Sequence, residues 1–332
     1  MFENTTKLQD ALKSLFLVCF GTEAQLVESV PSHASLRKYF LLSSGEKHAV
    51  GVYGPTLSEN QAFFHIQKEL SGKGIPVPDI LKVDDSGFYY LQSYHGPNDV
   101  FSYLENASNP LEVLKKSVEV LAKMHLETRN EFDFSLCYPH QRFDISEVKR
   151  EFWSFEHKYL ANKGITLKEE YFKQDIELVQ SILELIPDEE FGFMHRDFQT
   201  RNLLVDEAGN ITIIDFQGGR EGPIYYDLAA IIYSPESRHA HQYQNELIDF
   251  YRELFGDKKD RDTFMKYFLV ISLVRLLHTL GVHGVLGIEQ NNEFFKKNIT
   301  TAEEYLVEVL SRLKSDFNIE FKGLGSLYNS SV

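Results

Sequence analysis

The sequence predicts an α+β chain of two lobes, in which a small β-rich lobe precedes a larger, mainly helical one. Two observations favour this class. Short runs rich in β-branched and aromatic residues dominate residues 25–93, and apolar residues at helical spacing dominate most of the chain after them. A length of 332 residues also exceeds the size that a single hydrophobic core usually serves. We therefore assign residues 1–94 to the first lobe and residues 95–332 to the second.

Composition limits the class of protein. Of the residues, 43% are hydrophobic and 25% are charged, which is ordinary for a globular chain and excludes wholesale disorder. The 34 Lys and Arg face 49 Asp and Glu, for a net charge of −15. This balance argues against nucleic-acid or anionic-membrane partners, which require surplus basic side chains. With only Cys19 and Cys137 and no signal-peptide pattern, we expect a cytoplasmic protein without a disulfide framework.

The first lobe is expected to hold two helices and five strands. Leucines at helical spacing predict a helix over Asn4–Phe20, and Gly21 ends it. A second helix is predicted over Asn60–Leu70. The predicted strands are Gln25–Val30, Leu36–Leu42, His48–Tyr53, Asp79–Val83 and Phe88–Ser93.

The second lobe is expected to be helical except for one β-rich island. Helices are predicted over Leu111–Glu127, Asp144–Asn162, Lys173–Leu185 and from Asp227 to about Leu313. The island consists of Phe191–His195, Asn202–Val205 and Ile211–Asp215. The apolar run Phe264–Ile288 contains Lys266, Arg275 and two histidines, which favours a buried helix over a membrane span.

The island carries a motif of catalytic type. It contains His195-Arg-Asp-Phe-Gln-Thr-Arg-Asn202 and, one hairpin later, Ile213-Ile-Asp-Phe-Gln217. This spacing matches the protein-kinase pattern H-R-D-L-x-x-x-N followed by D-F-G, with Phe198 in place of the leucine and Gln217 in place of the glycine. The motif predicts an ATP-dependent phosphotransferase.

Three side chains of the motif suit phosphoryl transfer, which depends on positioning and charge neutralisation. Asp197, in a loop just after a strand, suits the carboxylate that accepts the hydrogen bond of the attacking hydroxyl. Asp215 suits a Mg²⁺ ligand, and Asn202 adds a neutral oxygen ligand at the same end of a hairpin. Mg²⁺ would also carry the phosphate charge of ATP into an acidic protein.

The segment after the motif indicates a small acceptor. Protein kinases have a long activation segment there, but only the nine residues 218–226 separate Gln217 from Asp227. Nine residues leave little room for a peptide-docking platform. Asp227 is expected to cap the next helix and, with His195, to brace the catalytic loop.

The chain resembles the aminoglycoside phosphotransferase/choline kinase superfamily over roughly residues 23–290. The matching segments are Ala34–Phe40, Leu121–His125, His195–Asn202 and Ile214–Ala229. The last two are most similar to the anomeric N-acetylmuramate/N-acetylglucosamine kinases of bacterial cell-wall recycling. The resemblance implies a two-lobed, protein-kinase-like fold and ATP-dependent phosphorylation of an amino sugar at C1.

The nucleotide half departs from the protein-kinase pattern. The loop Pro31–Ser35 lies where a glycine-rich phosphate cover is expected but holds no glycine, and Tyr53 stands where that pattern has lysine. Arg37 or Lys38 would supply the positive charge, and we choose Arg37. Glu59 would pair with Arg37, or else is an exposed residue favoured by the helix dipole.

The resemblance places adenine against the hinge Gln92-Ser-Tyr94. The expected nucleotide-binding residues are therefore Ser35, Arg37, Glu59, Gln92 and Tyr94.

Candidate acceptor residues are Arg201, Arg220 and Trp153. Arg201 either meets phosphate or sugar or forms a structural ion pair. Trp153 belongs to an aromatic cluster with Phe152, Phe155 and Tyr159, for which core packing is favoured over a platform that stacks on a sugar. Rival acceptors are an aminoglycoside, choline or a homoserine-like alcohol. A non-catalytic nucleotide-binding scaffold is disfavoured by the intact motif, and the oligomeric state stays open.

Overall fold

The computed structural model describes residues 2–30, 36–256 and 259–328. Its internal contacts define two compact units. Unit 1 comprises residues 1–106, 132–141 and 201–219, and unit 2 comprises residues 107–131, 142–200 and 220–332. Neither unit is continuous in sequence. The lobe boundary after residue 94 stays a prediction.

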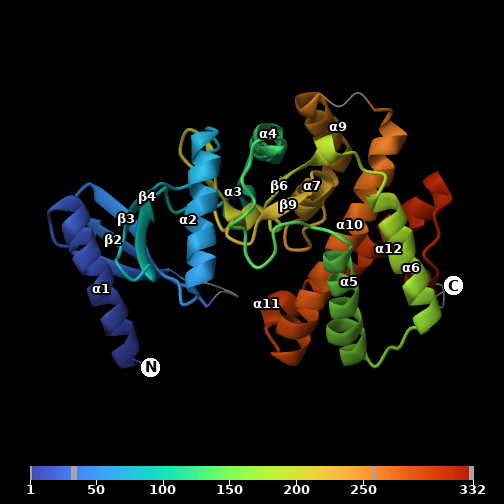
Figure 1. Cartoon of the computed structure of the whole chain (residues 1–332), viewed down its shortest axis with the longest axis horizontal. Helices are drawn as coiled ribbons and strands as arrows, with labels where there is room; N and C mark the ends of the chain where they lie inside the picture. The colour runs from blue at the N-terminus through green and yellow to red at the C-terminus, as the bar shows by residue number, and fades with distance from the viewer. Residues whose placement is uncertain (1, 31–35, 257–258, 329–332) are drawn as a thin grey trace. The chain divides into compact units, whose positions relative to one another are not determined.

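Unit 1 is built on an antiparallel five-stranded sheet with the order β1-β2-β3-β5-β4 (Figure 1). The strands are β1 (Leu26–Val30), β2 (Lys38–Ser44), β3 (Lys47–Tyr53), β4 (Ile80–Val83) and β5 (Tyr89–Ser93). A two-residue turn joins β2 to β3, and Gly45 adopts φ 59° there, which only glycine enters without strain.

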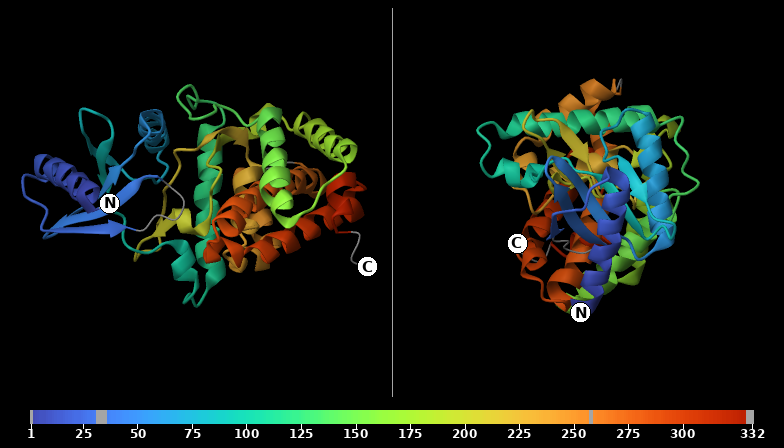
Figure 2. Two further views of the ribbon diagram at one scale, coloured as in Figure 1. Left: turned by 90° about the horizontal axis from the view of Figure 1, so that it is seen from below. Right: turned by 90° about the vertical axis from the view of Figure 1, so that its left-hand side faces the viewer.

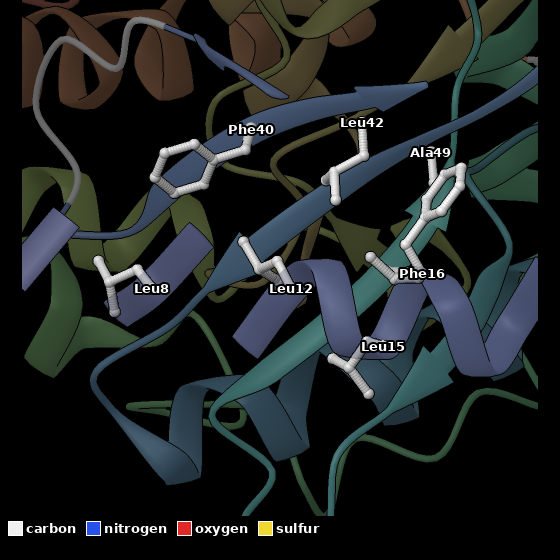
Figure 3. Close-up of a cluster of buried hydrophobic side chains, with 8 residues drawn as sticks. Leu8, Leu12, Leu15, Phe16, Phe40, Leu42 and Ala49 are labelled. Carbon is white, nitrogen blue, oxygen red and sulfur yellow. The ribbon is translucent and has the colours of Figure 1, made fainter. Parts of the chain in front are cut away.

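Helix α1 (Phe2–Phe20) covers one face of this sheet, as the right-hand view of Figure 2 shows. Leu12 and Phe16 lie one turn apart on the helix and are fully buried against Leu42 and Ala49 (Figure 3). Each such side chain contributes roughly 2 kcal/mol by leaving water. The helical periodicity of the N-terminal leucines therefore correctly identified this half of the unit 1 core.

The hairpin of β7 (Leu203–Val205) and β8 (Ile211–Ile213) also belongs to unit 1. The backbone N–H of Ile213 donates to the carbonyl of Pro76, which follows α2 (Leu57–Gly72), at 2.8 Å. The N–H of Val205 donates to the carbonyl of Asn98, just before α3 (Val100–Leu104), at 3.0 Å. These bonds fix the hairpin that carries two of the predicted site residues.

Unit 2 is mainly helical. Its helices are α4 (Pro110–Thr128), α5 (Ile145–Ser154), α6 (Glu169–Leu183), α7 (Tyr225–Ile232), α8 (Arg238–Gln242), α9 (Gln244–Phe255), α10 (Arg261–His283), α11 (Glu293–Lys296), α12 (Ile299–Phe317) and α13 (Lys322–Ser326). A π-helical segment, Phe155–Leu160, follows α5, and a second one, Gly284–Glu289, follows α10. Short 3-10 turns lie at Ala161–Lys163, Asp188–Glu190 and Thr200–Asn202 along the chain.

Helix α10 is the core helix of unit 2. Among the described residues one helical stretch, Arg261–Glu289, is long and apolar enough to cross a membrane, judged by length and composition alone. Within its most apolar window, 78% of the residues are buried inside the chain. The apolar run is therefore a buried helix, as predicted, and it contacts α5, α7 and α12.

The sequence prediction missed one strand and misplaced one cap. β9 (Arg220–Pro223) pairs antiparallel with β6 (Phe191–Met194), although the sequence Arg-Glu-Gly-Pro lacks the β-branched residues typical of strands. Helix α7 begins at Tyr225 with Ile224 as its N-cap, so the prediction of Asp227 as N-cap is wrong. The α+β class, with a small antiparallel sheet and a larger helical part, is confirmed.

Candidate active site

The catalytic loop of unit 2 follows β6 and is held by a buried carboxylate. Asp227, fully buried on α7, accepts hydrogen bonds from the backbone N–H of His195 at 2.7 Å and of Arg196 at 2.9 Å. Nε2 of the buried His125 lies 3.4 Å from the same carboxylate. Arg196 adopts φ 75°, a left-handed conformation that a side chain makes costly. The Asp227 carboxylate therefore holds a strained turn in place, which explains why it is unavailable as a helix cap.

His195 and Asp197 are linked within this loop. The buried His195 ring accepts a hydrogen bond from the backbone N–H of Asp197 at Nδ1, at 3.2 Å. The carbonyl of Asp197 in turn accepts from the N–H of Gln199 at 2.8 Å. These two bonds fix the backbone of the loop on both sides of Asp197.

The Asp197 carboxylate is half-exposed and faces an arginine from the core helix. Its side chain is 49% exposed, and Oδ1 lies 3.2 Å from Nη2 of Arg275 on α10. Arg275 is only 4% exposed, donates to the Thr279 hydroxyl, and lies 5.9 Å from the Tyr226 ring. Sequence reasoning treated Arg275 only as an interruption of an apolar run. The available signal was that a charge buried in such a helix requires a partner.

A cluster of charged groups adjoins the catalytic loop. We call Arg150, Arg196, Arg220, Glu147, Glu151 and His278 the arginine cluster. At one end, the buried Glu147 binds Nη1 of the fully buried Arg220 at 2.5 Å and Nη2 of Arg150 at 2.6 Å. Arg220, predicted to touch substrate, is thus enclosed and paired with a carboxylate.

Glu151 is the other carboxylate of the arginine cluster. It lies 2.8 Å from Nδ1 of His278, 3.2 Å from Nη2 of Arg196 and 3.4 Å from Nη2 of Arg150. Burial raises the pKa of the Glu151 carboxyl, but the charge and hydrogen bond of His278 and the charges of Arg196 and Arg150 lower it to about 2. Glu151 is therefore ionised throughout the physiological pH range.

This depressed pKa predicts a pH-dependent loss of stability for Glu151→Gln. At pH 7 the variant should lose about 3 kcal/mol of unfolding free energy, because the buried position no longer carries the negative charge that Arg196, Arg150 and His278 surround. The native pKa of about 2 lies below the ordinary 4.5, so the contribution of Glu151 is complete above pH 4.5 and disappears as the pH falls toward 2. Urea unfolding at pH 7, 4 and 3 should show the gap to wild type closing. A gap that stays constant, or an equal loss in the exposed control Glu170→Gln, contradicts this account.

In unit 1 the β7–β8 hairpin brings Asn202 and Asp215 to one end. The N–H of Ile214 donates to the carbonyl of Asn202 at 3.0 Å, and Asp215 adopts φ 64° directly after the strand. Gln217 donates from Nε2 to Oδ1 of Asp215 at 2.8 Å. Its Oε1 is buried and has no hydrogen-bond partner among the described residues.

This oxygen set fits a hard divalent cation. Carboxylate and amide oxygens are the ligands that Mg²⁺ and Ca²⁺ take, and a buried orphan carbonyl oxygen requires a partner. Within the described part of the chain, no group of three or more His, Cys, Asp or Glu residues is arranged to hold a metal. A cation on Asp215 would therefore rely on amide oxygens as well. In the sequence, Gln217 stands out only as a departure from the glycine of the kinase pattern.

Arg37 forms a buried ionic centre in unit 1. It is 1% exposed, donates to the Tyr90 hydroxyl at 2.8 Å and lies 3.5 Å from the Glu59 carboxylate through Nε. Burial lowers the pKa of Arg37, but the charges of Tyr90, Tyr39, Glu59 and Asp215 outweigh it and raise the pKa. Lys38, the alternative, is exposed at the start of β2. The structure thus brings Arg37, Glu59 and Asp215 into one electrostatic group.

The remaining predicted site residues are dispersed. Ser35 lies outside the described residues. Gln92 in β5 pairs with Val50 and Ile80, and Tyr94 follows the strand, 5.8 Å from the His48 ring. Arg201 is half-buried and, like Asn202, belongs to unit 1, whereas Asp197, four residues before Arg201, belongs to unit 2.

Trp153 does not pack in the core. Phe152, Phe155 and Tyr159 are buried, but Trp153 is 51% exposed and stacks on His157 with ring centroids 4.6 Å apart. Trp153 neighbours Phe152 in the helix and so points in a different direction from it. The prediction of core packing is therefore wrong for Trp153 and correct for the other three.

Comparison with known proteins supports the chemistry of these motifs. The model of the phosphotransferase enzyme family matches residues 27–261. A probable choline kinase 1 of Arabidopsis thaliana is 49% identical over 43 residues, which span 13% of this chain and 12% of that protein.

Solved structures share the fold at low identity. A putative aminoglycoside phosphotransferase from Ralstonia eutropha JMP134 is 13% identical with a TM-score of 0.63, covering 90% of this chain and 98% of that one. A choline/ethanolamine kinase family protein from Mesorhizobium loti is 13% identical with a TM-score of 0.64, covering 97% and 98%. An amicoumacin kinase determined with AMP-PNP, Ca²⁺ and its ligand is 13% identical with a TM-score of 0.59, covering 93% and 96%.

These likenesses confirm the protein-kinase-like fold, with its small antiparallel sheet and larger helical part. The family match extends over most of the chain and includes every residue of the catalytic motif. The chain therefore belongs to the phosphotransferase enzyme family and is an ATP-dependent phosphotransferase that acts on a hydroxyl group of a small molecule.

Proposed function

We propose that the acceptor is an amino sugar of the N-acetylmuramate or N-acetylglucosamine type, phosphorylated at its anomeric hydroxyl in the cytoplasm during recycling of cell-wall sugars. The observation that carries the proposal is the catalytic sequence, His195–Asn202 followed by Ile214–Ala229, which resembles the anomeric sugar kinases. The surroundings of Asp197 support it. Glu147 and Glu151 are enclosed by cations, so neither offers a free carboxylate to a cationic acceptor such as choline.

In this proposal Asp197 is the catalytic base. Its half-exposed carboxylate accepts the hydrogen bond of the acceptor hydroxyl and then its proton as the oxygen attacks the γ-phosphate in line. Arg275 fixes the orientation of the carboxylate from the core side. Asp227 and His195 hold the loop, so that little reorganisation is required during the reaction.

Asn202, Asp215 and Gln217 would hold a divalent cation, which we propose is Mg²⁺. When bound, this cation neutralises phosphate charge on ATP. The amicoumacin kinase with AMP-PNP and Ca²⁺ supports a nucleotide–cation pair in this fold.

The other nucleotide and acceptor residues remain proposals. Arg37, paired with Glu59, would set the electrostatic field around Asp215, and the backbone of Gln92–Tyr94 would face adenine, with Ser35 near the phosphates. Contacts of Arg201 or of the exposed Trp153 with the acceptor stay predictions from the sequence. Arg220 would act through Glu147.

An acceptor panel tests the proposed function. ATP consumption would be followed with Mg²⁺ and N-acetylmuramate, N-acetylglucosamine, choline, an aminoglycoside and homoserine, with Asp197→Asn as the blank. We expect turnover with the amino sugars above that blank. Turnover confined to choline, the aminoglycoside or homoserine contradicts the proposed acceptor. Calorimetric binding of Mg·ATP with no turnover on the panel would instead favour a nucleotide-binding scaffold.

A further inference from the structure

The arginine cluster draws its side chains from four segments of unit 2, namely α5, the catalytic loop, β9 and α10. On α5, Glu147, Arg150 and Glu151 share one helix face because they are three and four positions apart. On α10, His278 follows Arg275 by three positions, so it too lies on the side of the helix that reaches Asp197. Helices α5 and α10 are in contact, as Figure 1 also shows. The cluster is therefore continuous with the proposed catalytic base.

The exposed side chains of the arginine cluster are those of Arg150 and His278. The carboxylates of Glu147 and Glu151 are 2% and 3% exposed, whereas the side chains of Arg150 and His278 are 39% and 27% exposed. Solvent therefore meets nitrogen donors, and the acidic groups lie beneath them. Within the cluster, a ligand therefore meets the guanidinium group of Arg150 before it meets either glutamate.

Arg150 retains unused hydrogen-bond donors. It binds Glu147 and Glu151 through Nη2 alone. Its Nε and Nη1 make no hydrogen bond or ion pair with any described residue. A guanidinium group carries five N–H donors, so those on Nε and Nη1 remain for a ligand.

Three guanidinium groups lie close together in the cluster. Three guanidinium groups, those of Arg150, Arg196 and Arg220, share the two carboxylates of Glu147 and Glu151. Burial and the charges of Arg196 and Arg150 lower the pKa of Arg220 to about 10, despite the opposing charge of Glu147. The neighbouring guanidinium groups thus disfavour the charge on Arg220, and an anion bound beside them would favour it.

We propose that the acceptor carries a small anionic group besides its reacting hydroxyl, and that Arg150 binds this group with His278 beside it. The inference rests on the proposed function, because it requires a small-molecule acceptor whose hydroxyl group binds at Asp197. It narrows the acceptor class to sugar acids or sugar phosphates, of which N-acetylmuramate, with its carboxylate, is one. Arg150 is thereby a specificity-determining residue.

A neutral isostere of the acceptor gives the sharpest test. The wild type would be compared on N-acetylmuramate and its methyl ester, which lacks the negative charge and carries one added methyl group. We expect the acid to have the higher kcat/KM by about tenfold to a hundredfold, which is the worth of a charged hydrogen bond. N-acetylglucosamine 6-phosphate forms a third arm, and a preference for it would identify phosphate as the anion. Equal kcat/KM for the acid and the ester overturns the inference without any variant.

The variants locate the effect. Arg150→Gln should raise KM for the acid and leave the ester unchanged, so that the preference disappears, and Arg150→Lys should restore part of it. Lys149→Gln, which removes the neighbouring exposed charge of α5, should keep the full preference. If Arg150→Gln keeps the wild-type melting temperature and yet loses kcat/KM equally on the acid and the ester, that result overturns the assignment to Arg150. If Arg150→Gln fails to fold, the inference is tested by Arg150→Lys and by the wild-type kcat/KM values on the acid and the ester.

Failure of the proposed function is a distinct outcome. If no amino sugar is phosphorylated, that function is wrong, and the inference is judged on whichever acceptor the panel identifies. A preferred acceptor that is cationic or neutral overturns it, and one that is anionic and loses its advantage in Arg150→Gln supports it.

Discussion

Replacing Asp197 by asparagine should lower kcat by about 10²- to 10⁴-fold, the usual contribution of a positioned general base. The amide keeps the size of the side chain but cannot take the proton of the acceptor hydroxyl. ATP affinity should stay close to that of the wild type, because the residues proposed for the nucleotide and its cation lie elsewhere in the chain. Steady-state kinetics with the acceptor from the panel and calorimetry with Mg·ATP measure the two quantities separately.

The control for Asp197→Asn is Asp188→Asn, which removes a carboxylate that is 95% exposed. This variant should retain wild-type turnover. Asp197→Asn also removes the counter-charge of the buried Arg275, so the urea midpoint of the variant is measured beside its kcat. A kcat for Asp197→Asn within threefold of the wild type would rule out the proposed base.

Asp227→Ala should produce the largest loss of stability, about 3–5 kcal/mol of unfolding free energy. The substitution empties a fully buried position and leaves two backbone N–H groups, those of His195 and Arg196, without their acceptor. The left-handed turn at Arg196 then lacks the contact that holds it, so kcat should also fall. The unfolding free energy of Asp227→Asn should lie between those of the wild type and Asp227→Ala, since the amide oxygen can accept only part of these hydrogen bonds.

Urea unfolding and kcat of the folded fraction measure this prediction for Asp227. The control is Asp260→Ala, since Asp260 is an exposed carboxylate that accepts the N–H of Thr263 at 2.9 Å as the N-cap of α10. That variant should lose about 1 kcal/mol and keep its activity. If Asp227→Ala unfolds at the denaturant midpoint of Asp260→Ala, Asp227 does not hold the loop.

Periodicity and turn residues were sufficient to predict most of the fold. The N-terminal helix, the five strands of the sheet and the buried character of α10 all follow from patterns that extend over many residues. The spacing from Asp197 to Asn202 and Asp215 also identified the chemistry, since few arrangements of these residue types serve another purpose. Such features are local in sequence and so can be read from it.

Features set by tertiary contacts could not be predicted in this way. Asp227 has the residue type and position of a helix cap, but its carboxylate is used by a loop 31 and 32 residues earlier in the chain. The strand β9 exists because β6 offers it a pairing edge. Which of the four aromatic residues Phe152, Trp153, Phe155 and Tyr159 is exposed depends on the direction in which α5 is packed.

The partners of charged residues were the least predictable feature of the site. Arg275 and Glu151 lie 78 and 45 residues from the loop residues that they bind. Nothing in the local sequence indicates these pairings, because they arise when α5 and α10 come together.

The most direct test is the identity of the phosphorylated product. The purified chain would be incubated with Mg·ATP and N-acetylmuramate, and the product examined by proton-coupled ³¹P NMR. The proposed function predicts one new phosphorus signal coupled to the anomeric proton of the sugar, absent with Asp197→Asn. A phosphorus signal coupled to any other position, or ATP hydrolysed to free phosphate with the sugar unchanged, would contradict it.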